Sequence, residues 1–309
     1  MSILLLESLH PEAETLLAAE GLLRAADPNG VVGNLSAVRA ILTRGRGRID
    51  EALMARCGAL RVIARVGAGL DNLDTAAAKR RGVVVIFAPG ANTDTVAEHT
   101  LALMLDLVRG ITRNATAVAA GRWEERGSYA GNEVRGLLLG IVGFGHIGQR
   151  TAELASAFGM GIAVAEHPRR APIPTGYSSL PLDRLLARAD VVSLHMPLSP
   201  ATRACIGARE LASMKATAYL INTARGALID QAALRDAIAQ HRIAGFASDV
   251  LDPEPPEPGD PLLRSDRVLI TPHVASLTAS TYRAMCLQTA ANVLAVLRGA
   301  VPAARSVFS

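Results

Sequence analysis

The sequence predicts an α/β protein with two domains, each built around a parallel sheet. Short apolar runs alternate with segments of helical periodicity along the whole chain, a pattern typical of βαβ units. The 309 residues exceed the length at which a single hydrophobic core usually stops growing. A glycine-rich loop also lies between an apolar run and a helical segment in the second half of the chain, as in doubly wound parallel sheets.

Half of the residues are apolar and 19% are charged, which favours a globular protein with a large core. No apolar run reaches the roughly 18 residues of a membrane span. The first seven residues lack a basic segment and are predicted to be a strand, not a signal peptide. Cys57, Cys205 and Cys286 lack the spacing of a disulfide framework or a zinc site, so we expect a cytoplasmic location and no metal.

The positive charge of the chain does not indicate a nucleic-acid partner. The formal net charge is +4 and the pI is about 9.3. However, the basic residues are scattered arginines, with Lys79 and Lys215 the only lysines, and aromatic residues for base stacking make up 3% of the chain. We therefore expect no nucleic-acid binding.

The elements follow in alternating order. In the first block, strands are expected at 3–6, 40–43, 62–65 and 83–87, and helices at 11–19, 50–54 and 72–81. Thr95 and Glu98 have capping-box spacing before a long helix at 96–108, although Thr93 or Asp94 are alternative caps. This helix is apolar around much of its girth, so we expect it to be buried. Further helices are expected at 111–120, 147–158 and 282–297, and strands at 137–142, 161–165, 190–195, 217–222, 244–248 and 268–270.

The loop Gly143-Phe144-Gly145-His146-Ile147-Gly148 joins one of these strands to the helix at 147–158. In this context the first glycine permits a tight turn, the second lets the backbone approach a pyrophosphate, and the third lets helix and strand pack closely. Glu166 ends the next strand, where an acid accepts hydrogen bonds from ribose hydroxyls. The loop therefore predicts a dinucleotide site with NAD favoured. Arg169 and Arg170 could instead bind a 2′-phosphate, which leaves NADP possible.

The position of this loop predicts the domain order. It lies in the second block, so the first block is predicted to bind substrate, and the final helix is expected to return to it. We therefore predict two Rossmann-like parallel-sheet domains. The nucleotide-binding domain (96–283) is inserted into a discontinuous substrate-binding domain (1–95 and 284–309).

Three further segments place charged or titratable side chains just past predicted strands: 222–226, 249–254 and 271–273. In an open parallel sheet, such strand ends face the ligand crevice. With these segments the chain resembles the D-isomer-specific 2-hydroxyacid dehydrogenase family, and most of all its phosphoglycerate dehydrogenases without regulatory domains. The resemblance covers nearly the whole length, including 65–74, 92–98, 143–148, 195–198, 214–215, 222–226, 249–255 and 271–276.

The resemblance implies a catalytic set of Arg225, Glu254 and His273. Reducing a 2-keto acid needs a hydride donor, a cation for the carboxylate and an acid for the carbonyl oxygen. Arg225 offers a bidentate guanidinium fork, and His273 titrates near working pH. Glu254 beside His273 would stabilise the imidazolium. Taken singly, each has a structural interpretation, but their order behind a dinucleotide loop favours catalysis.

The resemblance also implies ligand contacts outside this set. Besides the glycine loop, cofactor contacts are expected from Glu166, His195, Met196, Pro197, Thr223, Ala224, Arg225, Asp249, His273 and Ser276, and substrate contacts from Arg44, Ala68, Gly69 and Arg225. Asp249 would engage the nicotinamide carboxamide. His195 fits a cofactor pocket and a structural strand end equally well, whereas His99 is interpreted as structural.

The implied activity is NAD-dependent interconversion of a short D-2-hydroxy acid and its 2-keto acid by a homodimer that associates through the helix at 96–108. Arg44, Arg46 and Arg48 form a basic loop that suits an anionic substrate such as 3-phosphoglycerate, unless the loop is simply a solvated turn. The alternative is a glyoxylate/hydroxypyruvate reductase using NADPH. An NADH-sensing corepressor-like binding protein and a formate dehydrogenase are disfavoured, because the chain lacks an interaction tail and a longer N-terminal region.

Overall fold

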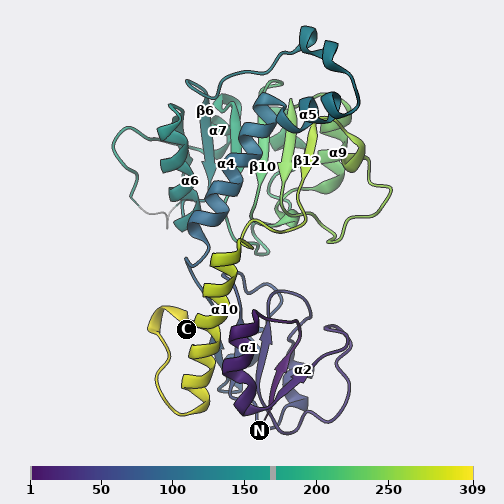
Figure 1. Ribbon diagram of the computed structural model, residues 1–309. Helices are drawn as coiled ribbons and strands as arrows, with labels where there is room; N and C mark the ends of the chain where they lie inside the picture. The colour runs from purple at the N-terminus through teal and green to yellow at the C-terminus, as the bar shows by residue number, and fades with distance from the viewer. Residues whose placement is uncertain (1, 168–171, 309) are drawn as a thin grey trace. The chain divides into compact units, whose positions relative to one another are not determined.

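The computed structural model describes residues 2–167 and 172–308. The chain forms two compact units (Figure 1). The first unit comprises residues 1–92 and 276–309, and the second comprises residues 93–275. Each unit has its own sheet and its own hydrophobic clusters.

The first unit contains a six-stranded sheet in the order β13-β5-β4-β3-β1-β2. Its strands are β1 (Ser2–Leu5), β2 (Leu22–Arg24), β3 (Val38–Thr43), β4 (Val62–Arg65), β5 (Val84–Ile86) and β13 (Val307–Phe308). The pairs among β1 to β5 are parallel and follow the flavodoxin-like order, whereas β13 pairs antiparallel with β5 at the edge. The carboxyl ends of β1, β3 and β4 therefore share one edge of this sheet.

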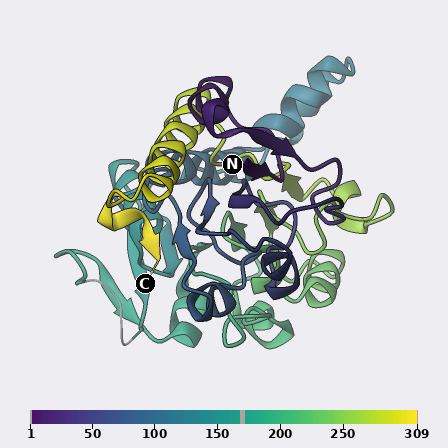
Figure 2. The ribbon, with the colours of Figure 1, turned by 90° about the horizontal axis from the view of Figure 1, so that it is seen from below.

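Four helices cover the first sheet: α1 (Pro11–Leu17), α2 (Glu51–Arg56), α3 (Thr75–Arg80) and α10 (Ala279–Leu297). One apolar cluster joins α1 and α10 to the strands, and a separate cluster joins α2 and α3 to them. Figure 2 shows α10, in yellow, beside α1, in purple. The last helix therefore belongs to the first unit, since α10 packs on β3, β4 and β5.

The second unit contains a seven-stranded parallel sheet in the order β12-β11-β10-β9-β6-β7-β8. Its strands are β6 (Leu138–Val142), β7 (Gly161–Ala165), β8 (Ser178–Leu180), β9 (Val191–Leu194), β10 (Tyr219–Asn222), β11 (Gly245–Ser248) and β12 (Val268–Ile270). The order is that of a dinucleotide-binding sheet with one added strand. The strand order reverses between β6 and β9, and this is where such folds bind their ligand.

The helices of the second unit are α4 (Thr93–Arg109), α5 (Ile111–Ala119), α6 (His146–Ala157), α7 (Leu182–Arg188), α8 (Ala208–Ser213) and α9 (Gln231–Ala239). One cluster combines apolar side chains of α4 and α6 with the sheet, and another combines those of α7, α8 and α9 with it. Seven of the 17 residues of α4 are buried, and the helix also packs on β10, β11 and β12. It begins at Thr93, so the predicted start at a Thr95 cap is wrong.

Three strands were not expected from the sequence: β2, β8 and β13. Each has only two or three residues, and most of these are partly or fully exposed, so none forms a continuous apolar run. The units divide at 92/93 and 275/276, whereas the predicted boundaries are 95/96 and 283/284. The second difference arises because α10 begins at Ala279, with the Thr278 side chain capping it through the Thr281 N–H.

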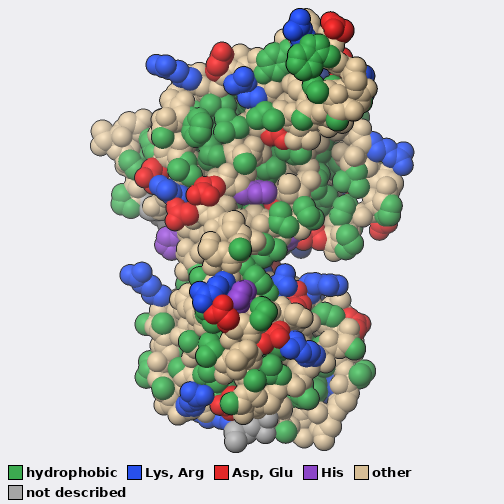
Figure 3. Space-filling view, in the orientation of Figure 1, with side chains coloured by type: hydrophobic (Ala, Val, Ile, Leu, Met, Phe, Trp, Pro, Cys, Tyr) green, Lys and Arg blue, Asp and Glu red, His purple; other side chains and the backbone are tan. Residues whose placement is uncertain are grey.

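Two surface properties bear on the classes of partner. None of the helices in the described ranges is both long and apolar enough to cross a lipid bilayer. On the face drawn in Figure 3, lysine and arginine side chains are scattered and do not form one continuous patch.

Candidate active site

The glycine loop after β6 has the geometry of a phosphate cradle. Gly143 has φ +102°, and a Cβ there would lie 2.6 Å from the backbone carbon of His195. At Gly148 a Cβ would lie 2.1 Å from the Gly143 carbonyl oxygen, so only glycine lets α6 pack this closely. A Cβ at Gly145 would meet nothing within 4 Å. The loop is thus closed on the protein side and open at its middle glycine, where a pyrophosphate must approach the backbone.

The start of α6 leaves backbone donors available at this loop. Gly145 is the N-cap and provides no side-chain capping bond, so the first N–H groups of the helix are free to bind an anion. The Gln149 side chain donates to the Phe144 carbonyl at 3.1 Å and braces the loop. Glu166 follows β7 and is exposed. The residues present therefore fit a dinucleotide. Arg169 and Arg170 lie outside the described residues.

The turn after β10 fixes the backbone of Arg225. Asn222 is fully buried; its side chain accepts from the Ala224 N–H and donates to the Arg225 carbonyl. A Cβ at Gly226 would lie 2.1 Å from the Leu251 backbone, so this turn is pressed against the loop that follows β11. Thr223 also bonds to Thr100 of α4 at 2.8 Å. The turn after β10 is therefore fixed against the loop that follows β11 and against α4.

Glu254 and His273 form a hydrogen-bonded pair. Glu254 Oε2 lies 2.8 Å from His273 Nδ1, and the two side chains are 38% and 46% exposed. Burial of Glu254 acts to raise its carboxyl pKa, but the hydrogen bond and charge of His273, aided by the Leu251 N–H and Arg225, hold the pKa below its usual value. The pair thus combines a carboxylate with an imidazole whose other ring nitrogen is available for chemistry.

The turn that carries His273 is anchored on Asp249. The Asp249 carboxylate is 1% exposed and accepts hydrogen bonds from Thr271 Oγ1 and from the N–H groups of Val274 and Ala275. His273 itself has φ +56°, a conformation that non-glycine residues rarely adopt. The predicted site residues that follow β10, β11 and β12 therefore converge at one edge of the sheet.

His195 does not share the chemistry of His273. Burial lowers the pKa of His195 to about 4, and its Nε2 lies 2.8 Å from the Ser193 hydroxyl. It is therefore neutral near pH 7. Its backbone and that of Met196 instead abut Gly143, which places both at the glycine loop.

Comparison with known proteins agrees with this geometry. Residues 101–275 match the family model described as D-isomer specific 2-hydroxyacid dehydrogenase, NAD binding domain. The chain belongs to the D-isomer specific 2-hydroxyacid dehydrogenases. The dehydrogenase is thus an oxidoreductase that interconverts hydroxy and keto acids with a nicotinamide dinucleotide.

Individual relatives extend the similarity beyond this domain. A glyoxylate reductase of Thermofilum pendens is 38% identical over 263 residues, 83% of this chain and 78% of the relative. A D-3-phosphoglycerate dehydrogenase of Methanocaldococcus jannaschii is 34% identical over 305 residues, 97% of this chain but only 58% of the relative. The crystal structure of a Thermus thermophilus protein superposes with a TM-score of 0.90 at 36% identity, covering 100% of both chains.

The remaining predicted residues of the dehydrogenase lie in the first unit. Arg44 follows β3, and Ala68 and Gly69 follow β4, at the carboxyl edge of that sheet. Ser276 is the first residue of the second segment of this unit. The structure thus divides the predicted site residues between the two units, with the catalytic set entirely in the second.

The basic loop around Arg44 is an organised structure. Glu7 Oε2 accepts from the N–H groups of Arg44 and Arg46 and from the Thr43 hydroxyl. The Arg44 guanidinium lies 5.1 Å from the centre of the Tyr282 ring, and Nη1 donates to the Ser8 carbonyl at 3.4 Å. These contacts hold the backbone of the loop and the Arg44 side chain in one conformation.

Sequence reasoning missed residues that support the site. Glu7 directly follows the predicted strand 3–6 and holds the Arg44 turn, whereas Asn222 is the last residue of β10 and holds the Arg225 turn. Arg65 begins the motif at 65–74, and its guanidinium occupies the space that Gly45 and Gly67 leave open. A Cβ at Gly67 would lie 2.5 Å from Arg65 Nη1. That arrangement has no signature in the sequence.

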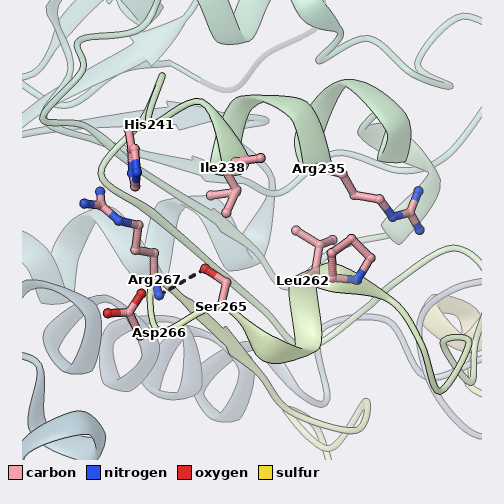
Figure 4. A pocket seen from close by; sticks show the side chains of 9 residues that line it. Arg235, Ile238, His241, Leu262, Ser265, Asp266 and Arg267 are labelled. Atoms are coloured by element: carbon pink, nitrogen blue, oxygen red, sulfur yellow. Dashed lines mark hydrogen bonds between the residues drawn. The ribbon is translucent and has the colours of Figure 1, made fainter.

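The pocket shown in Figure 4 is separate from this site. It is lined by residues of α9, of the 3₁₀ helix Pro261–Arg264 and of the segment before β12, including Arg235, His241 and Arg267. These residues precede β11 or β12, at the amino edge of the sheet, whereas the catalytic set follows the strands. Arg235 is also neutralised by Asp260 at 2.6 Å. The pocket contains none of the predicted site residues.

Proposed function

We propose that the dehydrogenase reduces a short anionic 2-keto acid to the D-2-hydroxy acid, and catalyses the reverse, with Arg225, Glu254 and His273 as its catalytic residues. The observation that supports this most strongly is the Glu254–His273 pair, which lies at the same sheet edge as the braced Arg225 turn. The bound nicotinamide supplies or accepts the hydride. These three side chains supply the other requirements of the reaction, which are a cation for the substrate carboxylate and a proton donor for the carbonyl oxygen.

The roles follow from the chemistry of each group. Arg225 presents a planar guanidinium that can hold the substrate carboxylate in two parallel hydrogen bonds. His273 uses its Nε2 to donate a proton to the carbonyl oxygen as charge develops there, and to accept it in the oxidation. Glu254 orients the ring through Nδ1 and stabilises its protonated form.

Replacing Glu254 with glutamine should move the pH profile of reduction to lower pH. Reduction needs protonated His273, so its rate falls as pH rises through the titration of that imidazole. Removing the carboxylate 2.8 Å away makes the imidazolium less stable, so the fall should begin at a lower pH. The measurement is kcat/KM for keto acid reduction against pH. A basic limb that does not move would refute the pairing as a catalytic one.

We infer a preference for NAD over NADP. Glu166 follows β7 and is exposed, so its carboxylate can accept hydrogen bonds from ribose hydroxyls and repel a 2′-phosphate. The family model also describes an NAD binding domain. The ratio of kcat/KM with NADH to that with NADPH tests the preference, and equal or faster turnover with NADPH would overturn it.

We propose 3-phosphohydroxypyruvate and 3-phosphoglycerate as the substrate pair, with glyoxylate or hydroxypyruvate reduction as the alternative. The support is the organised Arg44 loop: Glu7 holds its backbone, and the guanidinium, held by Tyr282 and the Ser8 carbonyl, favours an anion beyond the reacting carbons. A phosphoglycerate dehydrogenase and a glyoxylate reductase are both among the relatives, and the chain spans 58% of the former and 78% of the latter. Kinetics with the individual keto acids must therefore distinguish the two assignments.

Arg44→Ala provides that test. A charge-assisted hydrogen bond to a distal phosphate is worth roughly 1.5–3 kcal/mol, or about 10- to 150-fold in kcat/KM. The unmodified enzyme should thus reduce 3-phosphohydroxypyruvate faster than hydroxypyruvate, and Arg44→Ala should remove most of that difference. Arg80→Ala is the control, since Arg80 is exposed at the end of α3, before β5 and so at the amino edge of the same sheet. Better turnover of phenylpyruvate or a branched-chain keto acid would refute the phosphoglycerate assignment.

We also propose that the dehydrogenase is a homodimer that associates through α4 and its neighbours. The helix α5 and the 3₁₀ helix Trp123–Ser128 expose several large apolar side chains: Ile111, Val118, Trp123 and Tyr129 are 43–58% exposed. These side chains line one pocket, which a second copy would cover. Sedimentation should give about twice the chain mass of 32.3 kDa, and a mass of one chain would contradict the proposal.

A further inference from the structure

His99 reaches the turn that carries His273 from a helix distant in sequence. It lies in α4, and its side chain is 23% exposed. Its Nε2 lies 3.0 Å from Thr271 Oγ1 and 3.7 Å from Asp249 Oδ1. Thr271 is the first residue after β12 and stands two positions before His273. The α4 helix thus contacts the acid–base turn through one imidazole nitrogen.

The directions of these hydrogen bonds follow from counting protons. Thr271 has one hydroxyl proton, and its oxygen lies 2.6 Å from Asp249 Oδ1, which as a carboxylate can only accept. The Thr271 proton is therefore donated to Asp249. It follows that Thr271 accepts from His99, and that His99 carries its proton on Nε2. The result is a directed series of hydrogen bonds from His99 through Thr271 to the buried Asp249 carboxylate.

This series of hydrogen bonds ends on the groups that fix the backbone conformation of His273. Asp249 accepts from Thr271 on one side of His273 and from the Val274 and Ala275 N–H groups on the other. Between them, His273 adopts φ +56°, and such a conformation persists only when its surroundings over-determine it. Loss of the His99 donor leaves the Thr271 hydroxyl held by Asp249 alone, which weakens one of these three constraints.

We propose that His99 is a positioning residue that acts through Thr271 and Asp249 to hold the His273 imidazole in its working orientation. The inference rests on the proposed role of His273 as acid and base. Displacing a catalytic group by about 1 Å can cost about 100-fold in rate. The role of His99 therefore concerns kcat more than binding, because Arg225 and the glycine loop are held by other contacts.

Two substitutions at the same position test this. His99→Leu removes the donor at similar bulk, whereas His99→Gln keeps an N–H donor near the place of Nε2 and is the matched control. We expect His99→Leu to lower kcat by about 10- to 100-fold, with the keto acid KM and the NADH dissociation constant changed by less than about 3-fold. His99→Gln should recover most of the loss. Thr271→Val deletes the hydroxyl and with it both hydrogen bonds, so it should lower kcat at least as much as His99→Leu does, and His99→Leu should add nothing to it in the double variant.

The outcomes separate the inference from the proposed function. An unchanged kcat in His99→Leu, or a His99→Gln variant as slow as His99→Leu, overturns the positioning role. If His99→Leu does not fold, Thr271→Val decides: a lowered kcat supports the role and an unchanged one overturns it. If the unmodified protein turns over no 2-keto acid, the proposed function fails and the inference fails with it.

Discussion

Replacing Arg225 with lysine is expected to abolish most turnover while leaving NADH binding nearly intact. A lysine retains the charge but offers a point donor where the substrate carboxylate needs a planar fork. The loss should be about 100- to 1000-fold in kcat/KM, the range found when one transition-state donor is removed. The turn itself should persist, because Asn222 holds the backbone of Arg225 and not its side chain.

The measurement combines keto acid kinetics with a fluorescence titration of NADH. Arg264→Lys serves as the control, since Arg264 is exposed in the 3₁₀ helix Pro261–Arg264, before β12 and away from the catalytic edge. Turnover by Arg264→Lys should match that of the unmodified enzyme. An Arg225→Lys variant with unchanged kcat/KM would remove Arg225 from the site.

Replacing His273 with asparagine is expected to lower kcat by about 100- to 10,000-fold, the usual contribution of a positioned general acid or base. Asparagine is chosen because it tolerates the left-handed backbone that His273 adopts at φ +56°. The Asp249 hydrogen bonds to Val274 and Ala275 should therefore survive, and the variant should bind NADH as the unmodified enzyme does. What it lacks is a group that can donate a proton to the substrate and accept it back.

His241→Asn is a closely matched control. His241 also has a positive φ, of 55°, and is exposed, but it lies at the opposite edge of the same sheet. Turnover in this variant should be unchanged. If His273→Asn retained full turnover while binding NADH normally, another group would have to supply the proton.

Much of the second unit could be predicted because its signals are local. The glycine loop lies within six residues, and its flanking strand and helix have clear apolar periods. Arg225, Glu254 and His273 could be placed at one edge because parallel strands share the position of their carboxyl ends. The order of β10, β11 and β12 in the sheet brings these residues to neighbouring positions.

The contacts that hold these residues in place could not be predicted. Asp249 was expected to face the nicotinamide, and nothing in the sequence indicated that it also anchors the turn of His273. His99 was interpreted as structural, since its partner Thr271, 172 residues away, could not be recognised from residue spacing. The stacking of Arg44 on Tyr282 likewise joins β3 to a helix near the other end of the chain. Such pairings follow from the packing of elements, which residue spacing does not encode.

We propose that this chain transfers hydride between a nicotinamide and a small anionic 2-keto acid. It is tested most directly by incubating the pure protein with a panel of 2-keto acids, first with NADH and then with NADPH, and following the loss of the reduced nicotinamide. We expect turnover with NADH, fastest for 3-phosphohydroxypyruvate or another small anionic keto acid, and product of the D configuration. Binding of NADH without oxidation by any keto acid in the panel would contradict it and would favour a cofactor-sensing protein instead.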